Sequence, residues 1–246
     1  MNAALPVAIG AIAFLYAAVG HAGATGYIAV MTLFGIGPDV IRPTALVLNV
    51  LVASIATAQF FRAGHFRGGL FWPLAAASVP CALLGGAIRL PTETFEKLVA
   101  AVLVVSAIRL VRDAWPTRSR RAATPTSPPV PPVLAAIGGG IGLLSGLTGV
   151  GGGVFLTPLL LTLQAAPVKE VAAITAPFIL VNSLAGLAGG LATGRPLPPV
   201  SLPVIAAAVL GGVIGSHLGA FRLPVRGMQL LMAAVLAIAS VKLFGP

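Results

Sequence analysis

Two glycine-rich runs contain the backbone and side chains of this sequence that are best suited to bind a ligand. They are residues 20–26, GHAGATG, and residues 149–153, GVGGG. Each run follows one apolar stretch and precedes another of helical composition. A helix N-terminus exposes unpaired N–H groups and carries roughly half a positive charge, and successive glycine N–H groups form a concave anion-binding nest. The two runs therefore predict a site for a small anion.

Polar side chains in and near these runs are candidates for contacting that anion. His21 offers an imidazole that binds an anion or accepts a proton, although a histidine that satisfies loop backbone is a comparable alternative. Asn49 and Asn182 each lie within a long apolar stretch, where a polar group either marks a substrate pathway or joins helices. Threonines offer hydroxyls but also bond to their own helix. The predicted substrate-binding residues are His21, Gly23, Thr25, Gly26, Asn49, Thr148, Gly151, Gly152, Gly153 and Asn182.

The positions of the acidic residues also favour an anionic ligand. All five acids lie at the ends of apolar stretches or between them, namely Asp39, Glu93, Glu96, Asp113 and Glu170. A carboxylate-based sodium site or proton relay in the apolar interior therefore has no ligands, although backbone carbonyls remain an alternative for sodium. Cys81, the one cysteine, excludes a disulfide framework and a cysteine metal cluster. We predict no metal and no cofactor, and leave the coupling ion open.

The composition places the chain in a lipid bilayer. Of its 246 residues, 58% are hydrophobic and 8% are charged, whereas a soluble domain has about 25% charged residues. At about 20 residues per crossing, the length allows roughly ten spans. The net charge of +10 comes from 15 Lys and Arg against 5 Asp and Glu. Because most of these cations flank apolar stretches on one side, we attribute them to membrane topology and expect no nucleic-acid partner.

The apolar stretches recur in the same order in the two halves of the chain. They are 3–19, 27–37, 43–61, 70–88 and 98–115, and then 133–145, 154–166, 171–192, 201–219 and 227–244. Arg89-Leu90-Pro91 recurs as Arg222-Leu223-Pro224, and Asn49 recurs as Asn182 at the same offset of 133 residues. We predict one transmembrane repeat over 1–115, a second over 133–246, and a cytoplasmic Pro/Arg-rich linker over 116–132. Weak internal symmetry of this kind is typical of transporters.

The lengths of the stretches predict how each repeat enters the membrane. Residues 27–37 reach about 17 Å as a helix, roughly half of a core about 30 Å thick. The first two stretches of each half are therefore expected to form a broken or re-entrant helix hairpin whose irregular backbone lines a cavity. Three full crossings follow it. Because three is odd, the second repeat is inverted, and the chain is an all-α polytopic membrane protein with 8 to 10 membrane segments.

The cations support the inverted arrangement only slightly. With the linker in the cytoplasm, ten of the 15 Lys and Arg lie inside, against nine if each hairpin is instead one broken span. Other glycines have a simpler explanation, since a spacing of four residues lets helices pack closely. Those glycines are Gly138, Gly142, Gly146, Gly211, Gly215 and Gly219.

Enzyme motifs are absent from the sequence. The glycine run 149–153 is not followed by the further glycine of a dinucleotide fingerprint, and no phosphate-binding Gly-Lys-Ser/Thr loop occurs. Residues 142–146, GLLSG, miss the nucleophile elbow by one position, and no acid and histidine stand nearby to activate the serine. We predict that the chain is not an enzyme.

Residues 144–160, LSGLTGVGGGVFLTPLL, closely resemble the signature of the TauE/SafE sulfite exporter family, also called the TSUP transporters. Residues 177–186, PFILVNSLAG, look like its next block, and 42–49, RPTALVLN, and 62–66, RAGHF, look like the matching first-half segments. The resemblance covers nearly the whole chain. It implies a multi-pass carrier of the bacterial inner membrane that moves sulfite, thiosulfate or organosulfonates, commonly outward. The first break is less rich in glycine than the second, so the two halves are expected to contribute differently to the anion site.

Two functions follow from these observations. The first is a secondary transporter, an exporter by family resemblance, that exposes one midplane anion site alternately to each side. The second is an anion channel, which shares the helix-end chemistry but needs a continuous water path. The expected partners are a small anionic substrate (sulfite, thiosulfate or an organosulfonate), the lipid bilayer, and a second copy of the chain in a homodimer.

Overall fold

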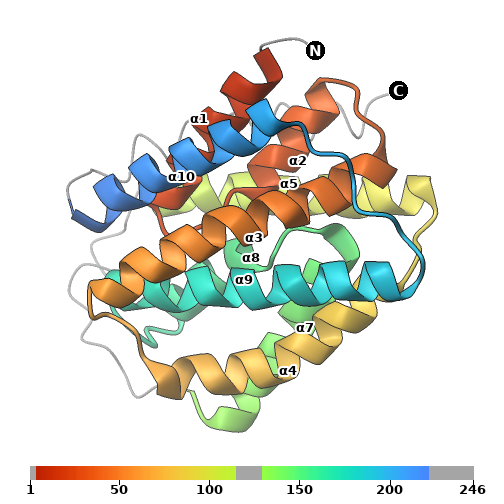
Figure 1. Cartoon of the computed structure of the whole chain (residues 1–246). Helices are drawn as coiled ribbons and strands as arrows, with labels where there is room; N and C mark the ends of the chain where they lie inside the picture. The colour runs from red at the N-terminus through yellow and green to blue at the C-terminus, as the bar shows by residue number, and fades with distance from the viewer. Residues whose placement is uncertain (1–3, 115–128, 222–246) are drawn as a thin grey trace.

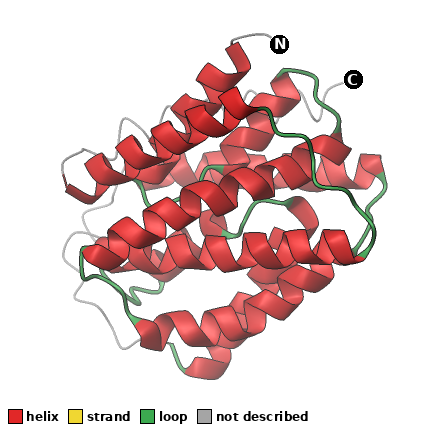
Figure 2. Ribbon diagram, in the orientation of Figure 1, coloured by secondary structure: helices red, strands yellow, loops and turns green. Residues whose placement is uncertain are grey.

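The computed structural model describes residues 4–114 and 129–221, and every regular element in them is a helix (Figures 1 and 2). The helices are α1 (Ala4–Ala18), α2 (Ala24–Leu33), α3 (Pro38–Arg62), α4 (Gly68–Ala87), α5 (Thr92–Ala114), α7 (Pro131–Thr148), α8 (Gly153–Thr162), α9 (Val168–Ala192) and α10 (Leu202–Phe221). The predicted all-α class is confirmed for these residues. The predicted stretch 227–244, Arg222-Leu223-Pro224 and residues 116–128 of the predicted linker lie outside them.

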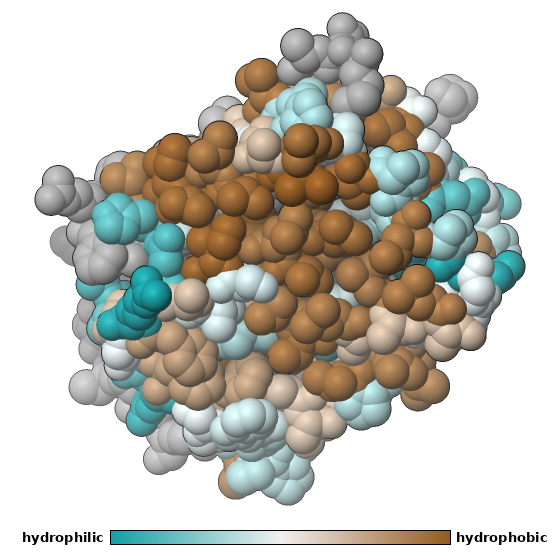
Figure 3. All heavy atoms as spheres, in the orientation of Figure 1, coloured by the Kyte–Doolittle hydropathy of each residue, from teal (hydrophilic) through white to brown (hydrophobic). Residues whose placement is uncertain are grey.

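Five of the described helices are long and apolar enough to cross a bilayer, and they are α3, α4, α7, α9 and α10. A helix satisfies its backbone groups internally, as lipid requires. Large apolar side chains face outward, with Trp72 66% exposed and Leu202 76% exposed. Figure 3 shows a broad hydrophobic face across the middle of the molecule, with hydrophilic residues toward two opposite ends. A surface this apolar fits lipid rather than water.

Two segments differ from the expected pattern of crossings. Residues 133–145 are expected to be a partial-depth arm of a hairpin, but α7 continues to Thr148 and is long and apolar enough to cross. Residues 98–115 are expected to be a full crossing, but α5 is not among the five helices that qualify in the described part of the chain. Charged residues near both ends of α5 reduce its hydropathy.

Helices α3 and α9 lie side by side and run in opposite directions (Figure 1). Leu46, near the start of α3, lies against Gly186, near the end of α9. Phe60, near the end of α3, clusters with Ala173 and Ala176, near the start of α9. The Nδ2 of Asn49 lies 3.3 Å from the Oγ of Ser183 between these two contacts. The two helices that contain the paired asparagines are therefore antiparallel.

Glycines spaced four residues apart bring α7 against α4 and α10 against α1. A Cβ added at any of them would collide with backbone of the neighbouring helix. The facing pairs are Gly138 with Leu74, Gly142 with Ser78, Gly146 with Ala82, Gly211 with Gly10, Gly215 with Phe14 and Gly219 with Ala18. The predicted packing role of these glycines is confirmed.

We expect Gly142→Ala to destabilise the protein, because the added Cβ would lie 2.7 Å from the Ser78 Cα. Overpacking of this kind costs about 1–3 kcal/mol, and more where backbone must move. Gly140→Ala on the same helix is the matched control, since a Cβ there meets nothing within 4 Å. Thermal unfolding of the purified protein in detergent measures both. Equal midpoints for the two variants would contradict the close approach of α7 and α4.

Candidate functional site

Both glycine-rich runs reverse the direction of the chain. Gly26 of α2 packs back against Ile12 and Tyr16 of α1, two helices joined by the first run. In the second half, α7 and α8 line one pocket together, and Gly152, just before α8, packs on Ile141 of α7. The helices that leave the two runs have 10 residues each, which corresponds to about 15 Å. Each run is thus the turn of a helical hairpin with one short arm (Figure 1).

Glycine makes both turns possible and leaves the short helices uncapped. Gly23 precedes α2 with φ of 102°, and Gly152 precedes α8 with φ of 82°. Residues with a β-carbon rarely adopt this left-handed conformation. Neither N-cap residue has a side-chain hydrogen bond to the first turn of its helix. The N-terminal N–H groups of both helices therefore lack the side-chain cap that usually satisfies one of them.

The two turns meet at one small cavity. Its lining includes the starts of both short helices, Thr25 and Gly153 among them, together with His21 and Asn49. The His21 Nε2 lies 3.2 Å from the Gly153 carbonyl oxygen, and its Nδ1 lies 3.2 Å from the Val19 carbonyl oxygen. Both carbonyl oxygens are acceptors, so a ring nitrogen that bonds to either of them donates its N–H. The His21 ring therefore lies between the two hairpins, within 3.2 Å of a carbonyl oxygen of each.

The paired asparagines differ in how well they are satisfied. Both are fully buried. The Asn182 Oδ1 accepts a hydrogen bond from Ser78 at 2.5 Å, and its Nδ2 donates to the Phe178 carbonyl at 2.9 Å. The Asn49 Nδ2 reaches the Val150 carbonyl at 3.5 Å, and its Oδ1 has no partner among the described residues. Long bonds of this kind are weak. Asn49 is therefore the member of the pair with hydrogen-bonding capacity left for a ligand.

Half of the ten predicted site residues line the cavity. His21, Gly23, Thr25, Asn49 and Gly153 do so, whereas Gly26, Thr148, Gly151, Gly152 and Asn182 do not.

Several of the others have structural contacts. Gly26 packs against side chains of its own hairpin, and Gly152 packs against Ile141 of its own hairpin and Phe178 of α9. The Thr148 hydroxyl donates to the Leu144 carbonyl at 2.7 Å, which is the alternative considered for threonines. Thr25, although it lines the cavity, donates to the Tyr16 hydroxyl at 2.9 Å. Gly151 packs directly against the Asn49 amide, as a Cβ added at Gly151 would lie 2.5 Å from the Asn49 Nδ2.

Three polar residues near the cavity are absent from the predicted set. Tyr16 lines it, and Tyr27 packs on Gly23 with its hydroxyl unpartnered among the described residues. Ser183 contacts the Asn49 amide from α9. The tyrosines were detectable in the sequence, because the chain has only two and both flank the first glycine run.

The cavity has a volume of about 10 Å³, close to the minimum for one water molecule. A four-atom oxyanion does not fit in this space. The hairpins must therefore separate before such an anion can bind between them, which would break the contact between His21 and Gly153.

Comparisons with known proteins agree with a multi-pass membrane transporter. Residues 5–243 match the family described as "Sulfite exporter TauE/SafE". The chain is 39% identical over 241 residues to the "Probable membrane transporter protein y4hK" of Sinorhizobium fredii, and the alignment covers 97% of this chain and 96% of that protein. No solved structure matches the chain.

Proposed function

Because the chain belongs to the sulfite exporter TauE/SafE family, we propose that it is a secondary transporter that exports a small sulfur oxyanion or organosulfonate across the bacterial inner membrane. The family identifies a membrane transporter and not an enzyme, as expected from the sequence. The observation that supports the substrate class is that the uncapped starts of α2 and α8 line one cavity. Sulfite carries its charge on three oxygens, so it can accept hydrogen bonds from both helix ends at once.

Two inverted repeats, 1–115 and 133–246, would place these helix ends on opposite sides of the substrate. The antiparallel course of α3 and α9 supports the inversion, because these helices contain the asparagines 133 residues apart. Helix packing supports the repeat itself, since α4 packs on α7 and the equivalent pair is α10 on α1. Discontinuous helices at a repeat interface are a common site for substrate in transporters. The linker 116–132 is then cytoplasmic.

A carrier accounts for the size of the cavity better than a channel does. A space of about 10 Å³ between the hairpins provides no water-filled site for a conducted anion. In a carrier, the same space is the occluded form of a site that opens to one side at a time. His21 joins the two hairpins in this form and would separate from Gly153 when either side opens.

Transport in proteoliposomes tests this function. Purified protein is reconstituted and assayed for uptake and counterflow with sulfite, thiosulfate, sulfoacetate and taurine, against protein-free vesicles. We expect saturable counterflow with at least one of the sulfur anions. Single-channel currents in planar bilayers would favour the channel instead. If none of the four compounds moves, the proposed substrate class is wrong.

A further inference from the structure

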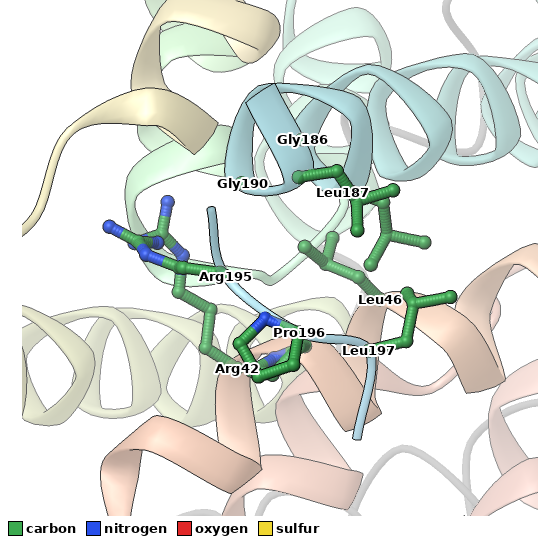
Figure 4. A pocket seen from close by; sticks show the side chains of 10 residues that line it. Arg42, Leu46, Gly186, Leu187, Gly190, Arg195, Pro196 and Leu197 are labelled. Atoms are coloured by element: carbon green, nitrogen blue, oxygen red, sulfur yellow. The ribbon is translucent and has the colours of Figure 1, made fainter. Parts of the chain in front are cut away.

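A larger cavity lies at the end of the molecule where α3 and α5 begin and α4 and α9 end. It has a volume of about 490 Å³ and is lined by residues from all of these segments, including Asp39, Arg42, Arg89 and Arg195. A smaller adjoining pocket shares Arg42 and Arg195, and Figure 4 shows their side chains extending to the same side of it. Three arginines and one aspartate leave this lining with a formal excess of two positive charges. We refer to it as the arginine cavity.

The three guanidinium groups are held by backbone carbonyls near helix ends. Arg42 donates to the Gly85 carbonyl at 2.7 Å and to those of Ile88 and Gly146. Arg195 donates to the Ile88 carbonyl at 2.7 Å, and Arg89 donates to the Thr193 carbonyl at 2.6 Å.

These carbonyls lie in the last turn of α4 or α7 or directly after α4 or α9. The helix dipole is negative at these ends. Such partial charges fix the arginines without neutralising them. The ion pairs found in the described residues are Arg67 with Glu170 and Lys97 with Glu93, and neither involves the arginine cavity.

The titration of Arg195 agrees with a crowded positive lining. Burial lowers the pKa of Arg195 from its ordinary value, the nearby charge of Arg89 lowers it further, and Asp39 raises it in opposition. A guanidinium keeps its charge at neutral pH in proteins. Asp39 therefore offsets the excess only in part.

Arg42 separates the arginine cavity from the second glycine run. Arg42 as a whole is only 6% exposed, although it lines the cavity. A Cβ added at Gly149 would lie 3.0 Å from the Arg42 Cγ, so the arginine stem packs directly on the turn between α7 and α8. Its guanidinium also bonds to Gly146 in the last turn of α7. One side chain thus contacts both the cavity and the hairpin.

We propose that the arginine cavity is a second site for small oxyanions, sulfonates and sulfur oxyanions among them, that exchanges its ligand with the site between the hairpins. Anion binding by the cavity is independent of the proposed function, whereas its place on the transport route rests on that function. A sulfonate forms charge-assisted, bidentate hydrogen bonds with a guanidinium, which are roughly twice as strong as neutral ones. An anion in the cavity therefore competes with the Gly146 carbonyl for Arg42 and loosens the end of α7 beside the second turn.

Charge-selective labelling of a single cysteine tests the cavity without transport. The background is Cys81→Ala, which removes the one native cysteine, and Leu197→Cys places a thiol in a residue that lines the cavity. Two methanethiosulfonates of similar size are compared, one with a sulfonatoethyl group and one with a trimethylammonioethyl group, each normalised to its rate with a free thiol. We expect the sulfonate reagent to react about 10-fold faster, the low end of electrostatic focusing in a charged cleft. We expect sodium sulfate to slow labelling by the sulfonate reagent more than sodium chloride of equal ionic strength does, because sulfate competes for the site.

Variants separate charge from structure. Arg89→Gln and Arg195→Gln bring the normalised ratio close to one, whereas Arg89→Lys and Arg195→Lys keep the charge and most of the preference. Arg67→Gln, which lies outside the lining, leaves the ratio unchanged. A ratio near one in the parent protein, or a ratio that the glutamine variants preserve, overturns the proposal.

Sulfite transport then tests the position of the cavity on the route. We expect Arg195→Gln to raise KM about tenfold with kcat nearly unchanged, and an unchanged KM overturns this position. If none of the four compounds is transported but the charge preference and sulfate protection persist, the proposed function fails and the anion site stands.

Discussion

We expect Gly151→Ala to lower the initial rate of sulfite counterflow by about 100-fold while the protein still folds. Gly151 has φ of 78°, and a Cβ there would lie 2.5 Å from the Asn49 Nδ2 and 2.9 Å from the Ile179 Cγ2. The left-handed conformation costs a residue with a Cβ about 1–2 kcal/mol. The collision adds to this by pushing the Asn49 amide away from the second turn. A displacement of about 1 Å in a binding group is enough for a 100-fold loss in comparable sites.

Gly64→Ala is the matched control for this effect. Gly64 has φ of 75°, and a Cβ there meets nothing within 4 Å. The two variants therefore introduce the same backbone strain, and only Gly151→Ala disturbs Asn49. Counterflow is measured in proteoliposomes that contain equal amounts of folded protein, as judged by size-exclusion chromatography. Similar rates for the two variants would show that Gly151 does not position the binding group.

The positions of the helices were predictable because lipid imposes simple rules on sequence. Long apolar stretches end at glycine, proline or charged residues. Nine of the ten predicted stretches overlap the described helices, one stretch to each helix. The packing glycines were predictable for the same reason, since their spacing of four residues puts them on one helix face.

The end of α7 was harder to predict, because residues 145–148, SGLT, resemble the break that follows them. The helix continues there because Gly146 packs on Ala82 and its carbonyl accepts a hydrogen bond from Arg42.

The candidate site was only partly predictable, because a position near a glycine run does not specify the direction of a side chain. Thr148 is adjacent to the second run and bonds back to its own helix, whereas Ser183 is 30 residues further on and contacts Asn49. Arg42 is the first residue of the segment 42–49 and was not among the predicted site residues. Its partners Gly85 and Gly146 are 43 and 104 residues away in sequence. Contacts between distant segments of this kind depend on how the helices assemble, which one sequence does not specify.

The second large effect is expected at Asn49. Asn49→Ala removes an amide that lines the cavity and has an unpartnered oxygen among the described residues. A hydrogen bond to a charged group contributes about 1.5–3 kcal/mol, and about 1.4 kcal/mol corresponds to a factor of ten. We therefore expect kcat/KM for sulfite to fall by about 10- to 100-fold. Its weak contacts with Val150 and Ser183, at 3.5 and 3.3 Å, mean that the thermal midpoint changes little.

Asn182→Ala is expected to do the reverse, and the contrast is the decisive measurement. It breaks the 2.5 Å bond from Ser78 and leaves that buried hydroxyl without its partner, which costs about 1–3 kcal/mol. The thermal midpoint in detergent should fall, while kcat/KM per folded molecule stays near that of the parent, because Asn182 does not line the cavity. If both variants lose transport equally at equal stability, the two asparagines contribute alike to the site. The division of labour between the halves, with Asn49 for the ligand and Asn182 for packing, would then be wrong.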